Sequence, residues 1–408
     1  MSEKDENLKA VAQQLIDKGK KVQLIYAFNG VGKTRLSRAL KELVAPKAEG
    51  GDEEPELTRR KILYYSAFTE DLFYWDNDLL DDSEPKLKIQ PNEFTDWVLR
   101  DRGQDRNIVD NFQRYTSRSI TPNFLPKDVV VDREGRRATT QTYPEVRFNF
   151  TGGDNVKNDV KISKGEESNL VWSVFYAVLQ EAVNILQEQD PVKRDDEQFD
   201  ELECVFIDDP VSSLDDPHLI ELAVDLAQLV KSCESDLKFI ITTHNPLFYN
   251  VLHNELKNSF KKERDGESMN VYKPNQALRW RLEKLRDGSL SLVEQDGRTP
   301  FSYHLLLLSE LKTAVDAGEL QKYHFNFLRN ILEKTATFLG YQKWGDLLPQ
   351  VDGAPDPFGA RIVNLSSHSA HSGEEVAALN ANDKEKLVEI VEHLFQRYHF
   401  LEQEAQDG

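Results

Sequence analysis

The sequence predicts a mostly parallel α/β sheet followed by a largely α-helical C-terminal region. Apolar, β-branched stretches such as "VQLIY", "ECVFID" and "LKFIITT" alternate with segments of helical spacing, which is typical of parallel sheets. The first stretch ends in a glycine turn and is followed by the helical pattern "KTRLSRALKELV". Past about residue 260 the pattern changes, and after Pro300 three long patterns have the apolar spacing of helices.

The 408 residues suffice for one large or two ordinary domains, and we place the boundary near residue 265. This gives an N-terminal domain over 1–265 and a C-terminal domain over 266–408. After the boundary, "ALRWRLEKLRDGSLSLVE" alternates with period two around Asp287-Gly288, which indicates a hairpin. Helices are expected over 303–315, 324–339 and 384–401.

Composition excludes several classes of protein. The formal charge of -20 opposes loose binding of nucleic acid, so such a partner requires a local basic surface. No apolar run reaches about 18 residues, and the N-terminus has no apolar signal-peptide core, so we expect no membrane partner and no export. Two cysteines, Cys204 and Cys233, argue against a disulfide framework and favour the cytoplasm.

The glycine turn after the first strand predicts a phosphate-binding loop. In "NGVGKT" glycines allow backbone N–H groups to approach phosphates, Lys33 is placed to meet the β- and γ-phosphates, and Thr34 is placed to ligate Mg²⁺. Ala27 replaces the first glycine of the usual pattern, where a small residue is the main requirement. The candidate nucleotide-binding residues here are Asn29, Gly30, Gly32, Lys33, Thr34 and Arg35.

Three later segments support nucleotide hydrolysis. The strand "VFIDD" delivers Asp208 to the Mg²⁺ shell, and Asp209 follows in position to polarise the attacking water. His244 ends another buried strand, where it can touch the same phosphate. The loop "SKGEE" opens a long helix and is suited to clamp a γ-phosphate. Its candidate residues are Ser163, Gly165 and Glu166, and Asp215 in "SSLDD" completes the set.

Together these motifs resemble those of ATP-binding-cassette (ABC) ATPases, in the right order over about residues 20 to 250. The resemblance implies an α/β ABC-type P-loop ATPase domain. It also implies a homo-oligomer, a dimer or tetramer, whose ATPase heads pair head to tail. Ser163, Gly165 and Glu166 would then complete the site of the partner chain in trans. The sequence departs from the pattern at Asp209, where a glutamate is usual, and no glutamine of the Q-loop is identified.

The C-terminal region carries a second candidate site. Arg329 and Glu333 are spaced i and i+4, which by itself favours an exposed ion pair on a helix. A polar loop with His368 and His371 follows. Arginine, glutamate and histidine are nonetheless the set that can cleave RNA without a metal: a base for the ribose 2′-OH, an acid for the 5′-oxygen and a guanidinium for the phosphate.

Over nearly its whole length the chain resembles the PrrC family of bacterial anticodon nucleases, in "KKVQLIYAFNGVGKTRLS", "FTEDLFYWDND", "SKGEESN", "DDPVSSLDD" and "RNILE". The resemblance implies that the helical C-terminal domain is a metal-independent nuclease. Its catalytic residues would be Arg329, Glu333 and a loop histidine, His368 in preference to His371. It implies cleavage of lysine tRNA 5′ to the wobble base, which leaves a 2′,3′-cyclic phosphate and a 5′-hydroxyl.

The same resemblance implies partners and regulators. The nuclease would act in antiviral defence and be kept latent by a type I restriction–modification complex. Hydrolysis of GTP, or of ATP, would gate it, and thymidine triphosphate would be a further regulator. An anticodon-recognition segment maps onto "EQDGRTPFSYH", with Asp296, Ser302 and Tyr303 at matching positions, although residues 297–300 diverge and leave the identity of the tRNA open.

A basic stretch offers the anticodon stem a contact surface, but it is equally compatible with a solvated hairpin face. It comprises Lys261, Lys262, Arg279, Arg281 and Arg286. Two other functions remain open. One is an ABC-type sensor whose C-terminal domain only docks a partner complex, and the other is a compact DNA-repair ATPase, which the charge of -20 disfavours.

Overall fold

The structure of the chain is a computed structural model that divides into two compact units, Met1–Pro300 and Phe301–Gly408. Each unit is described by itself below. The residues that the structure describes are 3–46, 61–66, 73–76, 86–90, 93–133, 136–152, 155–210, 214–264, 266–285, 287–295, 302–357, 359–360, 363 and 381–400.

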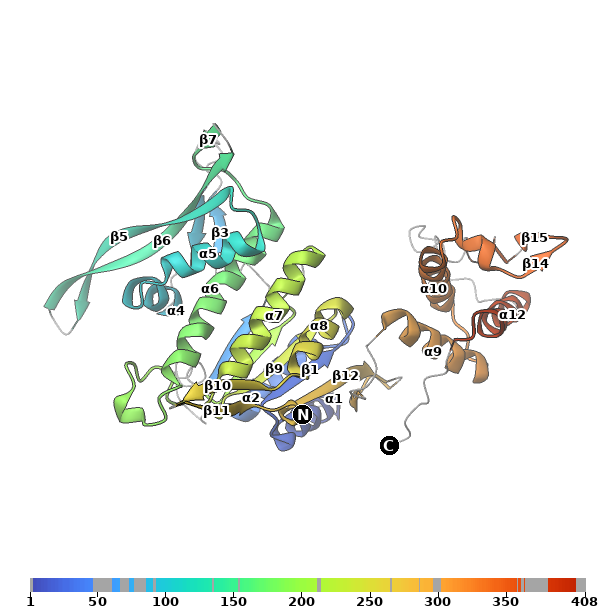
Figure 1. Cartoon of the computed structure of the whole chain (residues 1–408), viewed down its shortest axis with the longest axis horizontal. Helices are drawn as coiled ribbons and strands as arrows, with labels where there is room; N and C mark the ends of the chain where they lie inside the picture. The colour runs from blue at the N-terminus through green and yellow to red at the C-terminus, as the bar shows by residue number, and fades with distance from the viewer. Residues whose placement is uncertain are drawn as a thin grey trace. The chain divides into compact units, whose positions relative to one another are not determined.

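A six-stranded sheet forms the centre of the first unit, in the order β13-β12-β1-β9-β8-β2 (Figure 1). All neighbouring strands pair in parallel except β12 and β13, which form an antiparallel hairpin. The predicted parallel α/β sheet is therefore present. Its strands are β1 (Val22–Tyr26), β2 (Ile62–Ser66), β8 (Cys204–Asp208), β9 (Lys238–Thr243), β12 (Ala277–Lys284) and β13 (Leu290–Glu294).

Helices cover both faces of this sheet. On one face α1 (Glu3–Lys18) and α2 (Lys33–Val44) pack their apolar side chains against alternate residues of the strands, among them Ile25, Ile62 and Phe206. Figure 1 shows three further helices in front of the opposite face. These are α6 (Lys164–Ile185), α7 (Asp216–Ser232) and α8 (Pro246–Leu256). The alternation of side chains along each strand thus separates two apolar layers.

The predicted boundary near residue 265 is wrong, because β12 belongs to the sheet of the first unit. β12 pairs in parallel with β1, from Val22 opposite Ala277 to Tyr26 opposite Arg281. The buried indole of Trp280 also donates a hydrogen bond of 3.0 Å to Gln23 Oε1 of β1. The hairpin around Asp287-Gly288 was predicted correctly, but it completes the central sheet of the first unit instead of opening the second unit, which starts after Pro300.

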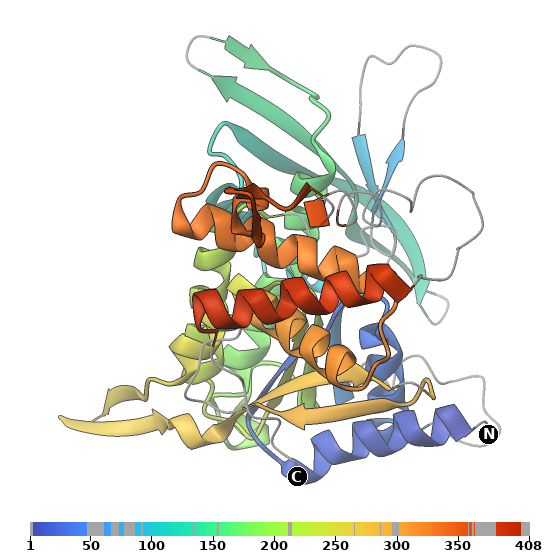
Figure 2. The same cartoon turned by 90° about the vertical axis from the view of Figure 1, so that its right-hand side faces the viewer.

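An antiparallel sheet, separate from the central one, precedes α6. Its strands run in the order β3-β4-β6-β5, and β7 pairs with β6, so that β5 and β6 form the long hairpin seen in Figure 2. The elements are β3 (Phe73–Asp76), β4 (Lys86–Ile89), α4 (Glu93–Asp96), a π-helix (Trp97–Asp101), α5 (Asp105–Tyr115), β5 (Ile120–Arg133), β6 (Arg136–Gly152) and β7 (Asn155–Lys157). A smaller hairpin joins β10 (Phe260–Arg264) to β11 (Glu267–Tyr272).

The second unit is built around three helices, as the sequence predicts. They are α9 (Tyr303–Asp316), α10 (Tyr323–Leu339) and α12 (Ala381–Tyr398). A 3₁₀ turn (Trp344–Leu347) and a short hairpin of β14 (Gln350–Val351) and β15 (Ala354–Pro355) follow α10. Figure 2 shows α12, in red, beside the two other helices, and leucine and isoleucine side chains from all three fill one core. Among the described residues no helix is both long and apolar enough to span a bilayer.

Candidate functional site

The phosphate-binding loop lies where β1 ends and α2 begins. Gly30 and Gly32 have φ angles of 80° and 128°, in the region that favours glycine. The Lys33 side chain is buried and folds back over the loop, where its ammonium group donates to the Ala27 carbonyl oxygen at 3.3 Å and to Asn29 Oδ1 at 3.1 Å. Both acceptors are neutral, and the nearest carboxylate oxygen among the described residues, Asp209 Oδ2, lies 3.6 Å away, so the ammonium group is held at the loop where an anionic phosphate would bind. Arg35 is exposed on the first turn of α2.

A candidate Mg²⁺ site joins α2 to β8. The Thr34 hydroxyl donates to Asp208 Oδ2 at 2.9 Å, and the Thr242 hydroxyl at the end of β9 donates to Asp208 Oδ1 at 2.6 Å. A hydroxyl and a carboxylate held in contact are the oxygen ligands that Mg²⁺ takes beside phosphates, so the residues present fit the ion. The sequence did not single out Thr242, which fixes the second carboxylate oxygen.

Asp209 lies at the centre of the site, just after β8 ends. Its φ of 55° is unusual for a residue other than glycine. The carboxylate forms an ion pair with His244 Nδ1, accepts from the Thr243 hydroxyl at 3.3 Å and lies 3.6 Å from Lys33 Nζ. Burial tends to raise the pKa of Asp209, but the hydrogen bond and charge of His244 and the charge of Lys33 outweigh it and lower the pKa. Asp209 is therefore held ionised, as a proton acceptor must be.

The loop "SKGEE", which corresponds to the signature loop of ABC ATPases in the predicted resemblance, forms the cap of α6. Ser163 is the N-cap residue: its hydroxyl accepts from the Glu166 backbone N–H at 3.3 Å, while Glu166 Oε2 accepts from the Ser163 N–H at 2.6 Å. Gly165 is the second residue of this helix. The capping box explains why these residue types begin α6 and orders a helix N-terminus toward which an anion is attracted. Completion of a partner's site in trans stays a prediction.

The D-loop residue Asp215 is the N-cap of α7. Its exposed carboxylate pairs with His218 Nδ1 on the first turn of that helix. Residues 211–213, which include both serines of "SSLDD", lie outside the described part of the chain.

In the second unit Arg329 and Glu333 form the ion pair that their spacing predicts. Arg329 Nε donates to Glu333 Oε1 at 2.8 Å, and the two side chains are 23% and 46% exposed on α10. The pair is thus open to a large ligand. His368 and His371 lie outside the described residues, as does Asp296. Ser302 is the N-cap of α9, accepting from the Leu305 N–H at 3.4 Å, and Tyr303 opens that helix.

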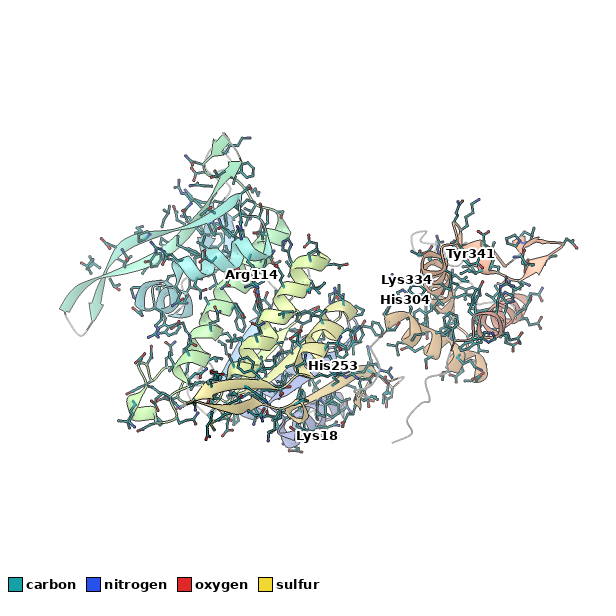
Figure 3. All side chains as sticks on the ribbon, viewed as in Figure 1. Lys18, Arg114, His253, His304, Lys334 and Tyr341 are labelled. Carbon is teal, nitrogen blue, oxygen red and sulfur yellow. The ribbon has the colours of Figure 1, made fainter. Side chains whose placement is uncertain are left out.

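Among the histidines of the second unit that sequence reasoning did not consider, three have a lowered pKa. Burial lowers the pKa of His304, and the charge of Lys334 beside it adds to this effect (Figure 3). The pKa of His324 is lowered by burial, and its Nδ1 accepts from the Gln321 N–H at 2.9 Å. The pKa of His393 on α12 is also lowered, and burial is the largest cause. At neutral pH all three favour the uncharged form.

The basic stretch does not form one exposed phosphate-binding surface. Arg279 is 5% exposed within β12, and Arg281 pairs with Glu283 on the same strand. Lys262 pairs with Glu234 at 3.0 Å. Arg279 is thus buried, and Arg281 and Lys262 are paired with glutamates of the first unit. Lys261 remains exposed, and Arg286 lies outside the described residues.

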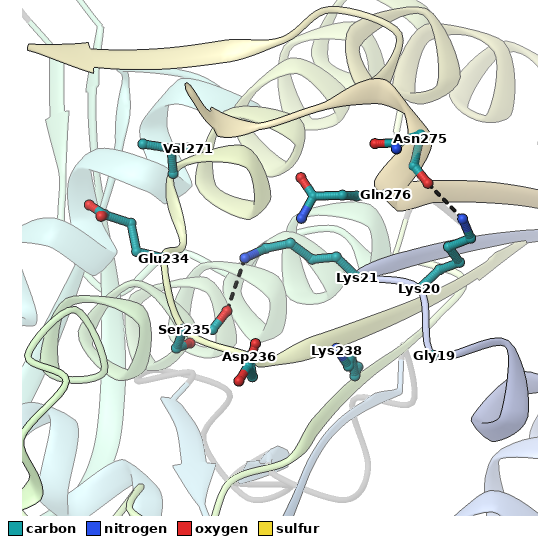
Figure 4. Close-up of a pocket in the computed structure, with 10 residues that line it drawn as sticks. All are labelled: Gly19, Lys20, Lys21, Glu234, Ser235, Asp236, Lys238, Val271, Asn275 and Gln276. Atoms are coloured by element: carbon teal, nitrogen blue, oxygen red, sulfur yellow. Dashed lines mark hydrogen bonds between the residues drawn. The ribbon is translucent and has the colours of Figure 1, made fainter. Parts of the chain in front are cut away.

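A pocket of about 310 Å³ lies at the opposite edge of the sheet, near the amino ends of β1 and β9 (Figure 4). Lys20 and Lys21 line it, and both donate to backbone carbonyl oxygens, the former to Asn275 at 2.8 Å and the latter to Ser235 at 3.0 Å. Burial lowers the pKa of Lys21. Because strands in a parallel sheet point one way, this pocket is distinct from the phosphate-binding loop at the carboxyl edge.

The fold and this site define a P-loop nucleotide hydrolase. In agreement, a family model described as an AAA domain matches residues 144–396, which extends from the first unit into the second and begins after the phosphate-binding loop. The chain is also 48% identical over 399 residues to the anticodon nuclease of Escherichia coli, an alignment that covers 95% of this chain and 92% of that protein. The chain therefore belongs to the anticodon nuclease family and carries an AAA-type ATPase domain.

Solved structures give weaker matches. The Smc head domain with a coiled coil and joint from Pyrococcus yayanosii is 13% identical, with a TM-score of 0.25 over 48% of this chain and 27% of that one. An SmcHead bound to the C-winged helix domain of ScpA is 11% identical, with a TM-score of 0.31 over 68% and 90% of the two chains. These scores are too low to support any argument about assembly.

Proposed function

We propose that this protein is a tRNA anticodon endoribonuclease whose activity is gated by nucleotide hydrolysis. The observation that carries the proposal is its 48% identity, over 95% of the chain, to a protein named anticodon nuclease. The exposed Arg329–Glu333 pair supports it, because an RNA loop needs a catalytic pair that is open to solvent.

Arg329, Glu333 and a histidine of the following loop are the proposed catalytic residues. Glu333 takes the proton of the ribose 2′-OH, and the Arg329 guanidinium stabilises the charge of the pentacovalent phosphate. His368, or else His371, protonates the departing 5′-oxygen. The reaction leaves a 2′,3′-cyclic phosphate and a 5′-hydroxyl, and its base, acid and cation are all side chains, so no metal enters the cleavage step.

The first unit supplies the gate. Lys33 and the N–H groups of the phosphate-binding loop hold the β- and γ-phosphates of GTP or ATP, and Asp209 with His244 orients the attacking water. Thr34 and Asp208 would hold Mg²⁺, which neutralises charge on the phosphates. The capped N-terminus of α6 at Ser163 is proposed to complete the site of a second copy, in a head-to-tail dimer or tetramer.

The finer proposals concern substrate and control. Lysine tRNA, cut 5′ to the wobble base, is the proposed substrate, with Asp296, Ser302 and Tyr303 in the recognition segment. We further propose that the protein is an antiviral toxin of the cytoplasm. A type I restriction–modification complex is its proposed masking partner, and thymidine triphosphate is its proposed regulator. Ser302 is the N-cap of α9 and Tyr303 is its first residue, so the helix fixes the backbone of both. From this position Ser302 and Tyr303 would present their side chains to an RNA loop.

The test is direct mapping of new RNA ends. The purified full chain is incubated with total tRNA, Mg²⁺ and GTP or ATP, with and without thymidine triphosphate, and 5′-hydroxyl ends are sequenced. The proposal expects one cut in an anticodon loop. It also expects no cut when the nucleotide on the 5′ side of that bond is 2′-deoxy, because the nucleophile is then missing. Uncut tRNA under all these conditions would refute the nuclease.

One observation favours an alternative, in which the C-terminal unit only docks a partner protein. Phe338 and Leu339 at the end of α10 are 87% and 48% exposed, which is unusual for such side chains. A sensor of this kind would hydrolyse nucleotide and bind its partner, and substitution of Arg329 or Glu333 would change neither property.

A further inference from the structure

Tyr65 on β2 has a buried hydroxyl group with no hydrogen-bond partner among the described residues. Its side chain is 2% exposed, and the oxygen atom is inaccessible to solvent. Leaving a buried hydroxyl unpaired is unfavourable, and proteins rarely retain one without a reason. A ligand that arrives later can supply the missing partner.

The position of Tyr65 in the sheet places it beside the candidate hydrolysis site. β2 and β8 pair in parallel with Tyr65 opposite Ile207, near the carboxyl edge. Ile62 and Phe206 belong to the core under α1 and α2, so alternation puts Tyr65 and Ile207 on the other face. Asp209 follows Ile207 by two residues. After burial, the charge of Asp209 is the second cause that raises the pKa of Tyr65, so the hydroxyl stays protonated and is a hydrogen-bond donor.

Tyr65 also contacts α6, the helix that starts at Ser163. The centroid of its ring lies 5.1 Å from the ring centroid of Trp172, in an edge-to-face arrangement, and 4.9 Å from that of Phe175. The Trp172 indole nitrogen is likewise buried without a hydrogen-bond partner among the described residues. Trp172 lies eight residues beyond Lys164, which is about 12 Å along the helix axis. Tyr65 thus pairs with β8 at Ile207, two residues before Asp209, and contacts the helix that starts at Ser163.

We propose that the Tyr65 hydroxyl is a positioning residue for nucleotide hydrolysis, which donates a hydrogen bond to the attacking water while Asp209 accepts that water's proton. The water oxygen forms the new bond to the γ-phosphorus, the bond from that phosphorus to the bridging oxygen breaks, and the released proton goes to Asp209. This role suits a site in which no Q-loop glutamine is identified, and it rests on the proposed nucleotide hydrolysis. Movement of Tyr65 when the water binds would be transmitted to Trp172.

The decisive variant is Tyr65→Phe, which removes only the oxygen atom. Its matched control is Tyr64→Phe, because Tyr64 is the preceding residue, is 38% exposed and points to the other face of the strand. With the full chain, Mg²⁺ and GTP or ATP, Tyr65→Phe is expected to lower kcat about tenfold or more and leave KM within about twofold. The nucleotide-free Tm should stay equal or rise, since an unpaired hydroxyl has been removed.

Each other result has a definite meaning. An unchanged kcat in Tyr65→Phe, or a loss of kcat that accompanies a lower Tm or weaker nucleotide binding, would overturn the inference and leave the hydrolysis itself in place. Absence of hydrolysis by the wild type, or hydrolysis that survives Asp209→Asn, would overturn the proposed nucleotide site as well. Tryptophan fluorescence gives a second measurement: nucleotide should change it in the wild type and Tyr64→Phe, and this change should be reduced in Trp172→Phe.

Discussion

Glu333→Gln should separate a catalytic role of the Arg329–Glu333 pair from a structural one. The substitution keeps the side-chain shape and helix propensity and removes only the charge. An exposed i,i+4 pair stabilises a helix by about 0.3 to 0.5 kcal/mol, and solvent screening reduces this at side chains that are 23% and 46% exposed. Loss of a general base costs a factor of about 10² to 10⁴ in rate. That is about 3 to 5 kcal/mol of barrier, roughly ten times the structural effect.

The assay measures single-turnover cleavage of an anticodon stem-loop, with urea unfolding of each variant beside it. A matched control is Asp316→Asn on α9, which breaks the Lys312–Asp316 pair, also spaced i,i+4 and separated by 3.1 Å. Both substitutions should lower the free energy of unfolding by less than about 0.5 kcal/mol. Only Glu333→Gln should stop cleavage, and nucleotide hydrolysis should survive in both. If Glu333→Gln cleaves RNA within about threefold of the wild-type rate, the catalytic assignment is refuted.

Three other predictions concern separate parts of the molecule. Thr34→Ala should lower nucleotide hydrolysis about 10²-fold and raise the Mg²⁺ concentration needed, measured by phosphate release; an unchanged Mg²⁺ dependence would contradict the metal assignment. Gly32→Ala should weaken nucleotide binding in calorimetry and destabilise the fold by about 1 to 2 kcal/mol, because of its φ of 128° rather than a clash, since a Cβ atom would lie an ordinary 3.5 Å from Leu290. His324 has a pKa below 6.5 in the folded state, so its stabilising contribution is complete above pH 6.5 and is lost as pH falls through the lower, folded-state value. As pH falls through that window, amide hydrogen exchange in α10 should accelerate in the wild type and should accelerate less in His324→Asn. Equal acceleration in the two proteins would exclude His324 as the cause of the pH dependence.

Much of the fold could be predicted because local patterns agree with the tertiary structure. The glycine turn at Gly30 and Gly32, the strand that ends at Asp208 and the helical periodicity of α9, α10 and α12 all appear as expected. The sequence analysis did not predict the long β5–β6 hairpin, because Pro122 and Pro126 interrupt its strand pattern. The boundary near 265 failed for a related reason: periodicity identifies β12 as a strand but cannot name β1 as its neighbour.

The structure brings together the residues predicted for the nucleotide site, whereas the histidines predicted for the nuclease site lie outside the described residues. Lys33, Thr34, Asp208, Asp209 and His244 are brought into one cluster by the parallel sheet, whose strands deliver their last residues to the same edge. Thr242 and Tyr65 were missed, since a threonine or tyrosine inside an apolar strand has no distinctive pattern. In the second unit the spacing of Arg329 and Glu333 correctly gave their ion pair, whereas the role of the pair stays a prediction.

The sequence by itself determined many of the local elements, because backbone geometry, capping and hydrophobic periodicity act over a few residues. It also determined the family, since 48% of the aligned positions are shared with one nuclease over nearly the whole chain. Only the tertiary structure decided that β12 completes the first unit and that Arg279 is buried in it. It alone decided that Tyr65, whose buried hydroxyl has no hydrogen-bond partner among the described residues, pairs with Ile207 two residues before Asp209, because strand order and register join residues that are distant along the chain.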